Sequence, residues 1–550
     1  MRTRTRNWLA ALAIGAFAAG QIQAWAQQNW GTWKGEGKSG PARESARREL
    51  PARDTGERGA PWQREEDFGE VKRQIGLITN TPAAWPGYML FAPKHFLYTY
   101  LMDNKGQVIN TWTSQYEPGQ SVYLLPNGNL VHCCFTKSGG FTRGGEGGRL
   151  EEYDWDGNLV WEFDYAGDTY LAHHDIAILP NGNILALAVE KKSYAECLAA
   201  GFRADSLRDR ELYPDYVIEI EPTRPKGGRI VWEWHVWDHL IQENDRTKAN
   251  YDDVSAHPER IWVDCNGNIA TAFWNHMNSI DYNANLDQIM LSVRGSSELW
   301  IIDHGTTTAE AKSDSGGRYG KGGRLLYRWG NPAAYQRGTA RDQTLFQQHD
   351  TQWIAEGCPG AGNILVFNNG LRRVPPGLSS SRDIPKPVVG KDWGYSSVDE
   401  FVPPVNADGS YRLAEGGSYG PTELTWTYVA PNPTDFFAEA ISGCQRLPNG
   451  NTLICDGTSG VFLEVTPGKE VVWKYVCPVT ADGPLEQGAP IPLDHRAHMM
   501  NAVFKVTRYP IDFAGLAGKD LSPKGALVGM KHSHVPENLS KARPRSGGRR

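Results

Sequence analysis

Three short stretches of the sequence place a histidine beside an acid or an amide. Each stretch begins an apolar run in which the side chains alternate, and the pairs are His174-Asp175, His276-x-Asn278 and His349-Asp350. An imidazole titrates near neutral pH and can act as a base, a nucleophile or a metal ligand, while a neighbouring carboxylate or amide can fix its tautomer. The repeated pattern therefore indicates a site at which three histidines act together.

Two further residues belong to this candidate site. Arg294, in QIMLSVRG, ends the strand expected after His276, and His173 stands directly before His174. A guanidinium pairs bidentately with sulfate, phosphate or carboxylate, so an arginine among imidazoles favours an anionic substrate. Three imidazoles at one point could also bind zinc, copper or iron, and a metal enzyme therefore stays open as an alternative.

The elements that must position these residues repeat along the chain. A strand that ends in aromatic residues recurs as GQVINTW at 106, GNLVWEF at 157, GRIVWEW at 228, GRLLYRW at 323, TELTWTY at 422 and KEVVWKY at 469. Hairpin loops rich in Asn and Gly lie between the copies, at LLPNGNLV, ILPNGNIL, VDCNGNIA, GAGNILVF and RLPNGNTLI. Six such units of four strands predict an all-β fold, a six-bladed β-propeller with long inter-strand insertions. A sandwich or a barrel would not need six copies of the aromatic strand.

The first strand of each propeller blade lines the central channel. The candidates for this strand are QSVYLLPNG, HHDIAILPNG, HMNSIDYNANLD, QHDTQWIAEG, SGCQRLPNG and MMNAVFKV. The three histidine pairs begin three of these strands, and we therefore expect them to meet at one mouth of the channel. The Trp-rich insertion at 231–242 is either a lid over that mouth or a packed aromatic cluster.

These residues also carry a family resemblance. HHDIAILPNGNIL, WNHMNSIDYNANLDQIMLSVRGSSELWIIDH, QHDTQWI and WEWHVWDHL, in this order, resemble the bacterial arylsulfate sulfotransferases over about residues 76–520. That family consists of secreted six-bladed propellers that move a sulfuryl group between phenols without a nucleotide donor. The resemblance implies a ping-pong mechanism through a histidine that is transiently sulfated.

The resemblance also implies a role for each site residue. His349 would be the nucleophile, and His276, Asn278 and Arg294 would hold the sulfuryl oxygens. His174, or His173 in its place, would contact the sulfuryl group or give a proton to the leaving phenolate. Asp175 and Asp350, which directly follow His174 and His349, would also contribute to substrate binding. Phenolate is a fair leaving group, so the resemblance implies no cofactor and no metal.

The ends of the chain predict export. Residues 1–26 have a basic start, a short apolar run and an Ala-x-Ala site, which is typical of a signal peptide. Residues 27–75 are expected to be a flexible linker, 76–522 the six-bladed β-propeller catalytic domain, and 523–550 a basic C-terminal tail. The expected location is periplasmic or secreted.

Composition bounds the partners. The chain has 550 residues, 40% of them hydrophobic, and a net charge of -6. This charge indicates no nucleic acid partner, and the short apolar run indicates no stable membrane insertion. The expected partners are a small-molecule aryl sulfate donor and a phenolic acceptor, and a homo-oligomer stays open.

Other functions remain compatible with the sequence. They are a related propeller sulfatase or lyase, a quinone-dependent enzyme that uses the adjacent Cys133 and Cys134, and a non-catalytic binding propeller. The chain has eight cysteines. If a two-residue Asn-Gly turn closes CQRLPNGNTLIC, Cys444 and Cys455 lie opposite each other and a disulfide between them is plausible.

Overall fold

The structure is a computed structural model that describes residues 69–136, 141, 147–266, 270–374, 393–494 and 498–532. The expected signal peptide, most of the expected linker and the end of the expected tail lie outside these residues. Among the residues that are described, no helix is long and apolar enough to cross a membrane.

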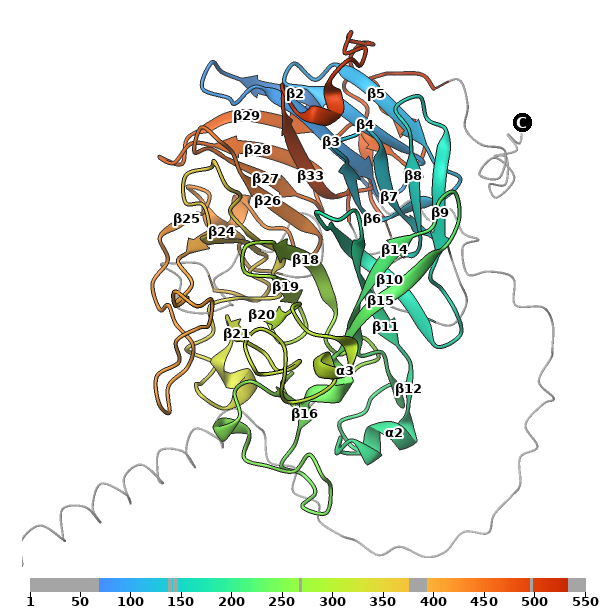
Figure 1. Cartoon of the computed structure of the whole chain (residues 1–550). Helices are drawn as coiled ribbons and strands as arrows, with labels where there is room; N and C mark the ends of the chain where they lie inside the picture. Colours follow the sequence, from blue (N-terminus) through green and yellow to red (C-terminus); the bar gives the residue numbers. More distant parts are fainter. Residues whose placement is uncertain are drawn as a thin grey trace, which may run out of the picture. The chain divides into compact units, whose positions relative to one another are not determined.

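Six antiparallel sheets form the six blades of a β-propeller, so the predicted fold class is confirmed (Figure 1). The first three blades are β33-β3-β4-β5, β6-β7-β8-β9 and β10-β11-β14-β15. Their strands are β33 (Val503–Pro510), β3 (Gly87–Pro93), β4 (Tyr98–Asp103), β5 (Val108–Thr113), β6 (Glu117–Leu124), β7 (Leu130–Phe135), β8 (Gly148–Tyr153), β9 (Leu159–Asp164), β10 (Tyr170–Ile178), β11 (Ile184–Glu190), β14 (Asp215–Pro222) and β15 (Gly228–His235).

The other three blades are β18-β19-β20-β21, β22-β23-β24-β25 and β26-β27-β28-β29, and β2 adds a fifth strand to the last. Their strands are β18 (Met277–Asn283), β19 (Gln288–Val293), β20 (Glu298–Asp303), β21 (Tyr327–Trp329), β22 (His349–Trp353), β23 (Ile364–Asn368), β24 (Ser397–Phe401), β25 (Trp426–Tyr428), β26 (Ser442–Arg446), β27 (Thr452–Asp456), β28 (Val461–Val465), β29 (Val471–Val476) and β2 (Gly76–Asn80).

Short elements lie outside the blades. Paired short strands are β1 (Glu70–Val71) with β32 (Ile491–Pro492), β12 (Lys192–Ser193) with β13 (Glu211–Leu212), β16 (Leu240–Ile241) with β17 (Ile261–Trp262), and β30 (Val479–Thr480) with β31 (Gly483–Pro484). The helices are α2 (Tyr194–Ala199), α3 (Thr308–Ala311), η1 (Val236–His239), η2 (Val254–Ala256), η3 (Pro332–Tyr335), η5 (Pro433–Asp435) and η6 (Ala514–Leu516).

The six predicted channel strands are the innermost strands β6, β10, β18, β22, β26 and β33, each of which contacts the next around the ring. The C-terminal strand β33 closes this ring because it pairs antiparallel with β3, as Figure 1 shows in dark red against blue. The channel is thus bounded by strands from the whole length of the propeller.

The repeated aromatic strand has a clear structural task. The fourth strand of each blade, counted from the channel, carries a tryptophan whose indole N–H donates to a backbone carbonyl of the next blade, at 2.6–2.9 Å. The pairs are Trp112 with Asp154, Trp161 with Gly227, Trp234 with Gly323, Trp329 with Pro421, Trp426 with Pro467, and Trp473 with Asn104. This circle of indoles joins every blade to its neighbour and returns to the first.

The LPNG loops connect inner strands to their partners. Their glycines, Gly128, Gly182 and Gly450, have φ near +87°, which a residue with a side chain rarely adopts. Leu447 N–H donates to the Asn451 carbonyl, so three residues rather than two form the loop of the last blade. This loop sets Cys444 opposite Ile454 and Cys455 opposite Gly443.

The predicted opposition of the two cysteines is therefore wrong by one residue, and a one-residue shift turns the side chains to different faces. All eight cysteines have free thiols in this structure.

One further prediction about a loop is corrected, and the structure decides between the two alternatives for the Trp-rich insertion in favour of a packed aromatic cluster. The stretch VDCNGNIA does not form a blade hairpin, because β18 and β19 are joined directly through residues 283–288. The Trp-rich insertion is no lid over the histidines: Trp232 and Trp234 are buried in the core, and the His239 ring lies against the Ala311 carbonyl. The insertion is packed because its apolar side chains have a large hydrophobic surface that is unfavourable to expose to water.

The boundaries of the propeller extend beyond the expected ones at both ends. Before residue 76, β1 pairs with β32. After residue 523, Lys524 N–H donates to the Val108 carbonyl and Leu527 is fully buried. The first part of the expected tail therefore packs against the first blade.

Candidate functional site

Three inner strands bring histidines together at one end of the channel. The His174 ring on β10 lies 5.1 Å from the His276 ring, centroid to centroid. The Phe504 ring on β33 lies close to two of the histidines, with centroid distances of 6.0 Å to His174 and 6.4 Å to His349. The predicted convergence of the three histidines is therefore seen in the structure.

A local irregularity aims each histidine. The pairing register shifts at Ala172/Ile176, at Met277/Ser279 and at His349/Gln352, which places a bulge at each histidine. His174 and His276 have φ of 52° and 50°. A bulge redirects a side chain, and left-handed backbone at a residue other than glycine is found preferentially at functional sites.

The tautomer of His349 is set by Asn369. The Asn369 side-chain amide donates from Nδ2 to the Ala438 carbonyl at 2.8 Å, so its oxygen points the other way. That Oδ1 lies 2.8 Å from Nδ1 of His349. Nδ1 therefore carries the proton, and the lone pair of the neutral ring is on Nε2.

Arg294 and His276 face a cavity. The backbone N–H of Arg294 donates to the His276 carbonyl at 3.3 Å, which holds the two residues side by side. Both line a cavity of about 340 Å³, together with Phe273, Trp274 and Gln347. An anion in this cavity would meet a guanidinium and an imidazole.

The electrostatics keep the rings neutral. Burial lowers the pKa of His349 to about 3, and the Arg294 charge adds to this effect. Burial, followed by Arg294, also holds the pKa of His276 well below its ordinary value. For His174, burial and the His173 ring act in the same direction. Neutral imidazoles have free lone pairs, as a nucleophile requires.

His173 connects His174 to a buried acid. Nδ1 of His173 lies 2.7 Å from Nδ1 of His174, and Nε2 lies 3.1 Å from Oδ1 of Asp215. Asp215 begins β14 and also accepts the Met277 N–H. His173 therefore lies between His174, to which it is hydrogen-bonded, and the Asp215 carboxylate, with which its Nε2 forms a close contact but no aligned hydrogen bond.

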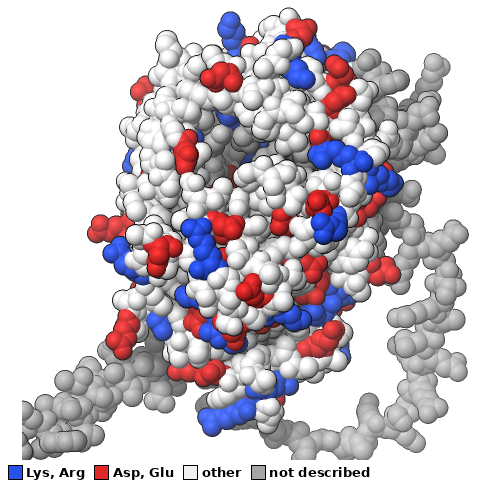
Figure 2. Space-filling view, viewed as in Figure 1, with Lys and Arg blue, Asp and Glu red and all other residues white. Residues whose placement is uncertain are grey.

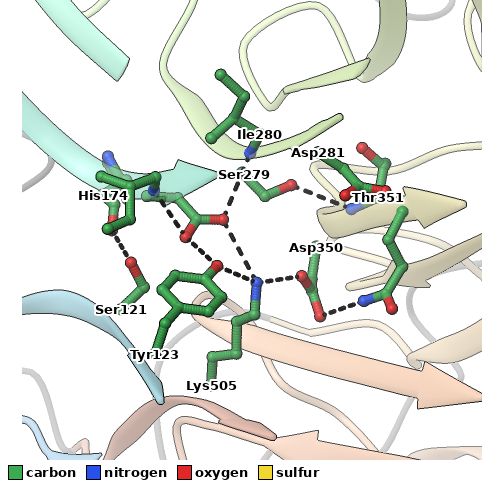
Figure 3. Close-up of polar contacts among 12 residues, drawn as sticks. Ser121, Tyr123, His174, Ser279, Ile280, Asp281, Asp350, Thr351 and Lys505 are labelled. Carbon is green, nitrogen blue, oxygen red and sulfur yellow. Dashed lines mark hydrogen bonds and ion pairs between the residues drawn. The ribbon is translucent and has the colours of Figure 1, made fainter. Parts of the chain in front are cut away.

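Asp175 and Asp350 lie on the other side of their strands and bind Lys505 (Figure 3). Lys505 Nζ is 2.9 Å from Asp350 Oδ1 and 3.4 Å from Asp175 Oδ2, and it donates to the Tyr123 hydroxyl. Burial alone would lower the pKa of Lys505, but the two carboxylates raise it well above the ordinary value. We expected each acid to fix the tautomer of the adjacent histidine. Asp175 and Asp350 bind Lys505 instead.

Asn278 bonds through its amide nitrogen toward the next inner strand. Its amide Nδ2 donates to the Gln348 carbonyl at 2.8 Å, which ties β18 to the residue before His349. Among the predicted residues, the structure thus brings His173, His174, His276, Arg294 and His349 together, while Asn278, Asp175 and Asp350 support the strands.

Sequence reasoning missed four residues that act on this group: Asn369, Asp215, Phe504 and Lys505. Asn369 follows β23, and Asp215 begins a second strand of its blade, where no repeated motif marks them. Phe504 and Lys505 did stand in a predicted channel strand. Their position in MMNAVFKV was the available signal.

A larger cavity of about 780 Å³ lies at the opposite end of the channel. It is lined by the ends of the inner strands and by LPNG loops, including Pro126, Pro180, Ile280 and Trp353. Lys505 and Asp350 lie at its inner wall, and no channel histidine lines it. Of the grouped residues, His276 and Arg294 line the smaller cavity.

The charged surface carries no large patch of one sign on the visible face. Figure 2 shows lysine and arginine side chains interspersed there with aspartate and glutamate. A mixed surface of this kind agrees with the small net charge of the chain.

The fold and the site define a β-propeller with histidines and an arginine at one end of its channel. The family model described as arylsulfotransferase (ASST) matches residues 71–381, a range that contains the five grouped residues and Asn369. The chain belongs to this family, so the resemblance found in the sequence is confirmed.

Two curated relatives have the name arylsulfate sulfotransferase AssT. The protein of Lelliottia amnigena is 25% identical over 438 residues, which are 74% of this chain and 64% of the relative. The protein of Escherichia coli O6:H1 (strain CFT073) is 25% identical over 243 residues, 41% of this chain and 38% of the relative. The match thus spans less than two thirds of the length of either relative.

Solved structures are more distant. A protein of unknown function from Bacteroides caccae aligns with a TM-score of 0.38 and 10% identity, over 77% of this chain and 98% of that chain. Virginiamycin B lyase from Staphylococcus aureus aligns with a TM-score of 0.31 and 9% identity, over 74% and 89%.

Proposed function

We propose that the protein is an exported, nucleotide-independent aryl-sulfate sulfotransferase that works by a ping-pong mechanism through a sulfated His349. Family membership supports the sulfotransferase class. The observation that carries the mechanism is the bond from His349 to Asn369, because it leaves the lone pair on Nε2 of a ring that has His174, His276 and Arg294 as electrostatic neighbours.

The first half-reaction transfers the sulfuryl group to the enzyme. Nε2 of His349 attacks sulfur, the S–N bond forms, and the bond from sulfur to the aryl oxygen breaks with its electron pair on the phenolate. Nδ1 keeps its proton and its bond to Asn369 as the ring becomes positive. Arg294 and His276 stabilise the charge on the sulfuryl oxygens, which is the usual task of fixed cations and dipoles in such sites.

The second half-reaction regenerates the enzyme. An acceptor phenol loses its proton and attacks the same sulfur, and the S–N bond breaks to restore neutral His349. His174, supported by His173 and Asp215, is placed to exchange this proton. The phenolate that leaves in the first half-reaction takes its proton from solvent, because His174 is neutral at that stage, and His174 returns the acceptor's proton to solvent after the second half-reaction.

The substrate classes and the location belong to this proposal as well. A phenolic sulfate is the donor and a phenol the acceptor, and the aromatic side chains Phe273 and Trp274 support binding of a ring beside Arg294. Export rests on the pattern of residues 1–26.

The test is a search for the intermediate. The protein is mixed with 4-nitrophenyl sulfate without acceptor, and its intact mass and peptide map are measured. We expect one added SO3 group on His349, its loss when phenol is added, and neither adduct nor transfer in His349→Ala. His257→Ala, in an ion-paired loop outside the site, serves as the control.

Two outcomes would contradict the proposal. Unchanged transfer in His349→Ala would exclude His349 as the nucleophile. Steady release of 4-nitrophenol without acceptor would identify a sulfatase instead of a transferase.

A further inference from the structure

The second blade contains a group of metal-binding side chains that the sulfuryl site does not use. His132 and Cys134 are two residues apart on β7, so their side chains share one face, and Glu151 on β8 is paired with His132. These three are the group of possible metal ligands found within the described residues. Each has at most 2% of its surface exposed.

A fourth donor completes the group. Ser114, which follows β5 and is 4% exposed, places its hydroxyl 2.8 Å from Oε2 of Glu151 and 3.9 Å from Sγ of Cys134. The Cys134 sulfur is 3.2 Å from Nδ1 of His132 and 3.2 Å from Oε2 of Glu151. One nitrogen, one sulfur and two oxygens therefore lie in one group, and the ligand atoms of His132, Cys134 and Glu151 are all within 4.8 Å of one another.

The spacing of these atoms fits a tetrahedral ion. Zinc bonds of about 2.0–2.3 Å at tetrahedral angles separate neighbouring donor atoms by roughly 3.3–3.5 Å. The four measured separations, 2.8, 3.2, 3.2 and 3.9 Å, lie on both sides of this range. Shifts of a few tenths of an ångström would bring all four to a zinc ion.

Partners around Glu151 hold the carboxylate in place, as groups behind metal ligands usually do. Tyr153 donates its hydroxyl to Oε2, and Arg149 donates from Nε to Oε1 at 2.8 Å. The ring of His132 has no hydrogen-bond partner at Nε2 among the described residues. Its contact in this group is made by Nδ1.

The charges balance with a divalent cation. Arg149 also binds Glu162 and Asp164, and Lys226 binds Glu162. With Glu151 these are three carboxylates and two cations, so the formal charge is -1. A Cys134 thiolate makes it -2, and one divalent ion makes the group neutral.

We propose that His132 Nδ1, Cys134 Sγ, Glu151 Oε2 and Ser114 Oγ bind one zinc ion that stabilises the second blade. The Cys134 thiol gives its proton to solvent as the Zn–S bond forms, and no electron is transferred. A thiolate with an imidazole selects zinc over magnesium or calcium, which prefer oxygen ligands. The site joins β7 and β8 to the end of β5 and takes no part in sulfuryl transfer.

The experiment uses the full chain and the metals alone. Protein purified without chelator is analysed for zinc per chain, and the zinc is then removed and replaced by Co²⁺. We expect about one zinc per chain, and an absorption band of thiolate-to-cobalt charge transfer. Chelation should lower the melting temperature because the metal binds only the folded chain.

The adjacent cysteine provides the matched control. Cys134→Ser should lose the cobalt band and most of the bound zinc. Cys133→Ser should keep both, because the Cys133 side chain lies on the other face of β7, where its sulfur is 3.4 Å from the Ser121 hydroxyl. His132→Gln is the second variant in case Cys134→Ser does not fold.

Two outcomes would contradict the proposed zinc site. Wild-type protein with far less than one zinc per chain and no cobalt band overturns the proposal. So does a cobalt band that survives in Cys134→Ser and disappears in Cys133→Ser. These readouts are independent of sulfotransferase activity.

Discussion

A single amide governs which nitrogen of His349 carries the lone pair. Asn369 is itself held by the Ala438 carbonyl and by Ser442, so its oxygen is directed at Nδ1 before substrate arrives. Side chains that orient a reacting group in this way typically contribute a factor of about 10–100. The residue is a positioning residue, since it acts through His349.

Replacing this amide should slow the chemistry more than the binding. We expect Asn369→Leu to lower kcat about 10–100-fold with little change in KM, because the ring can then adopt the tautomer with the proton on Nε2. Steady-state kinetics with 4-nitrophenyl sulfate and a phenol acceptor measure this split. A variant that changes only KM would contradict the assigned role.

The neutral state of the rings gives a second prediction at this scale. The folded pKa of His349 is lowered from 6.5 to about 3, and those of His174 and His276 are lowered in the same direction. We therefore expect no loss of kcat/KM attributable to these rings as pH falls from about 8 to about 5.

The same shift affects stability with a definite sign. In the unfolded chain this histidine is protonated near pH 6.5, whereas in the folded chain His349 is protonated only near pH 3. Its contribution to the free energy of unfolding is therefore complete above pH 6.5 and decreases as pH falls toward 3. A pH profile of activity with an acid limb near 6.5, without unfolding, would contradict the neutral rings.

At the scale of elements, one strand connects two of the histidine strands. Lys505 on β33 binds the acid after His174 on β10 and the acid after His349 on β22. Asp350 also accepts the Cys444 N–H, which brings β26 into the same network. Removing one ion from such a buried group leaves unpaired charge, at a cost of about 3–5 kcal/mol.

We accordingly expect Lys505→Met to lower stability by about 3–5 kcal/mol and to reduce activity, since two like carboxylates would then repel each other beneath the histidines. Denaturant unfolding and kinetics measure both effects. Lys105→Met, at an exposed turn, is the control. Equal stability of the two variants would show that the network contributes nothing.

The loop after β20 provides a prediction with the opposite pH sign. Burial alone would lower the pKa of His304, but Asp287 at 2.7 Å and Glu219 at 3.2 Å raise it to about 9. The charged ring thus stabilises the fold fully below 6.5, and this contribution is lost as pH rises through 9.

His304→Gln should therefore destabilise the protein by about 1–3 kcal/mol at pH 6 and by less near pH 10. Denaturant midpoints at the two pH values measure the difference. A deficit that grows with pH would contradict the raised pKa.

The sequence predicted the inner strands because each carries a local signal, such as the histidine pairs or an LPNG loop. VDCNGNIA has the same turn residues and no blade around it, since turn chemistry does not say which strands pair. Lys505 and Asp175 are 330 positions apart, and Asn369 acts 20 positions from His349. The Lys505 contacts exist only after β33 has closed the ring, and no repeated motif marks Asn369, which is why the tautomer control was assigned to the adjacent acids.

For the whole molecule, the circle of indoles converts six separate sheets into one unit. Trp473 is fully buried and donates across the junction between the last blade and the first. Trp426 makes the equivalent bond from a partly exposed position.

Trp473→Phe should lower stability by about 1–3 kcal/mol, because the buried indole loses its bond to the Asn104 carbonyl and a small cavity forms. Trp426→Phe should have a smaller effect, since water can replace its indole. Thermal and denaturant unfolding of the two variants and the wild type measure this order. The reverse order would mean that the indole bonds do not set the strength of the junctions.

The pairing of β33 with β3 affects when the site is completed during protein synthesis. A ribosome makes His174, His276, Arg294 and His349 well before it makes Phe504 and Lys505, which stand on the strand that closes the ring. Until that strand emerges, the aspartates beside two of the histidines have no counter-ion and the first blade has no inner strand. A growing chain should thus complete the surroundings of its channel histidines only at the end of synthesis, when β33 pairs with β3.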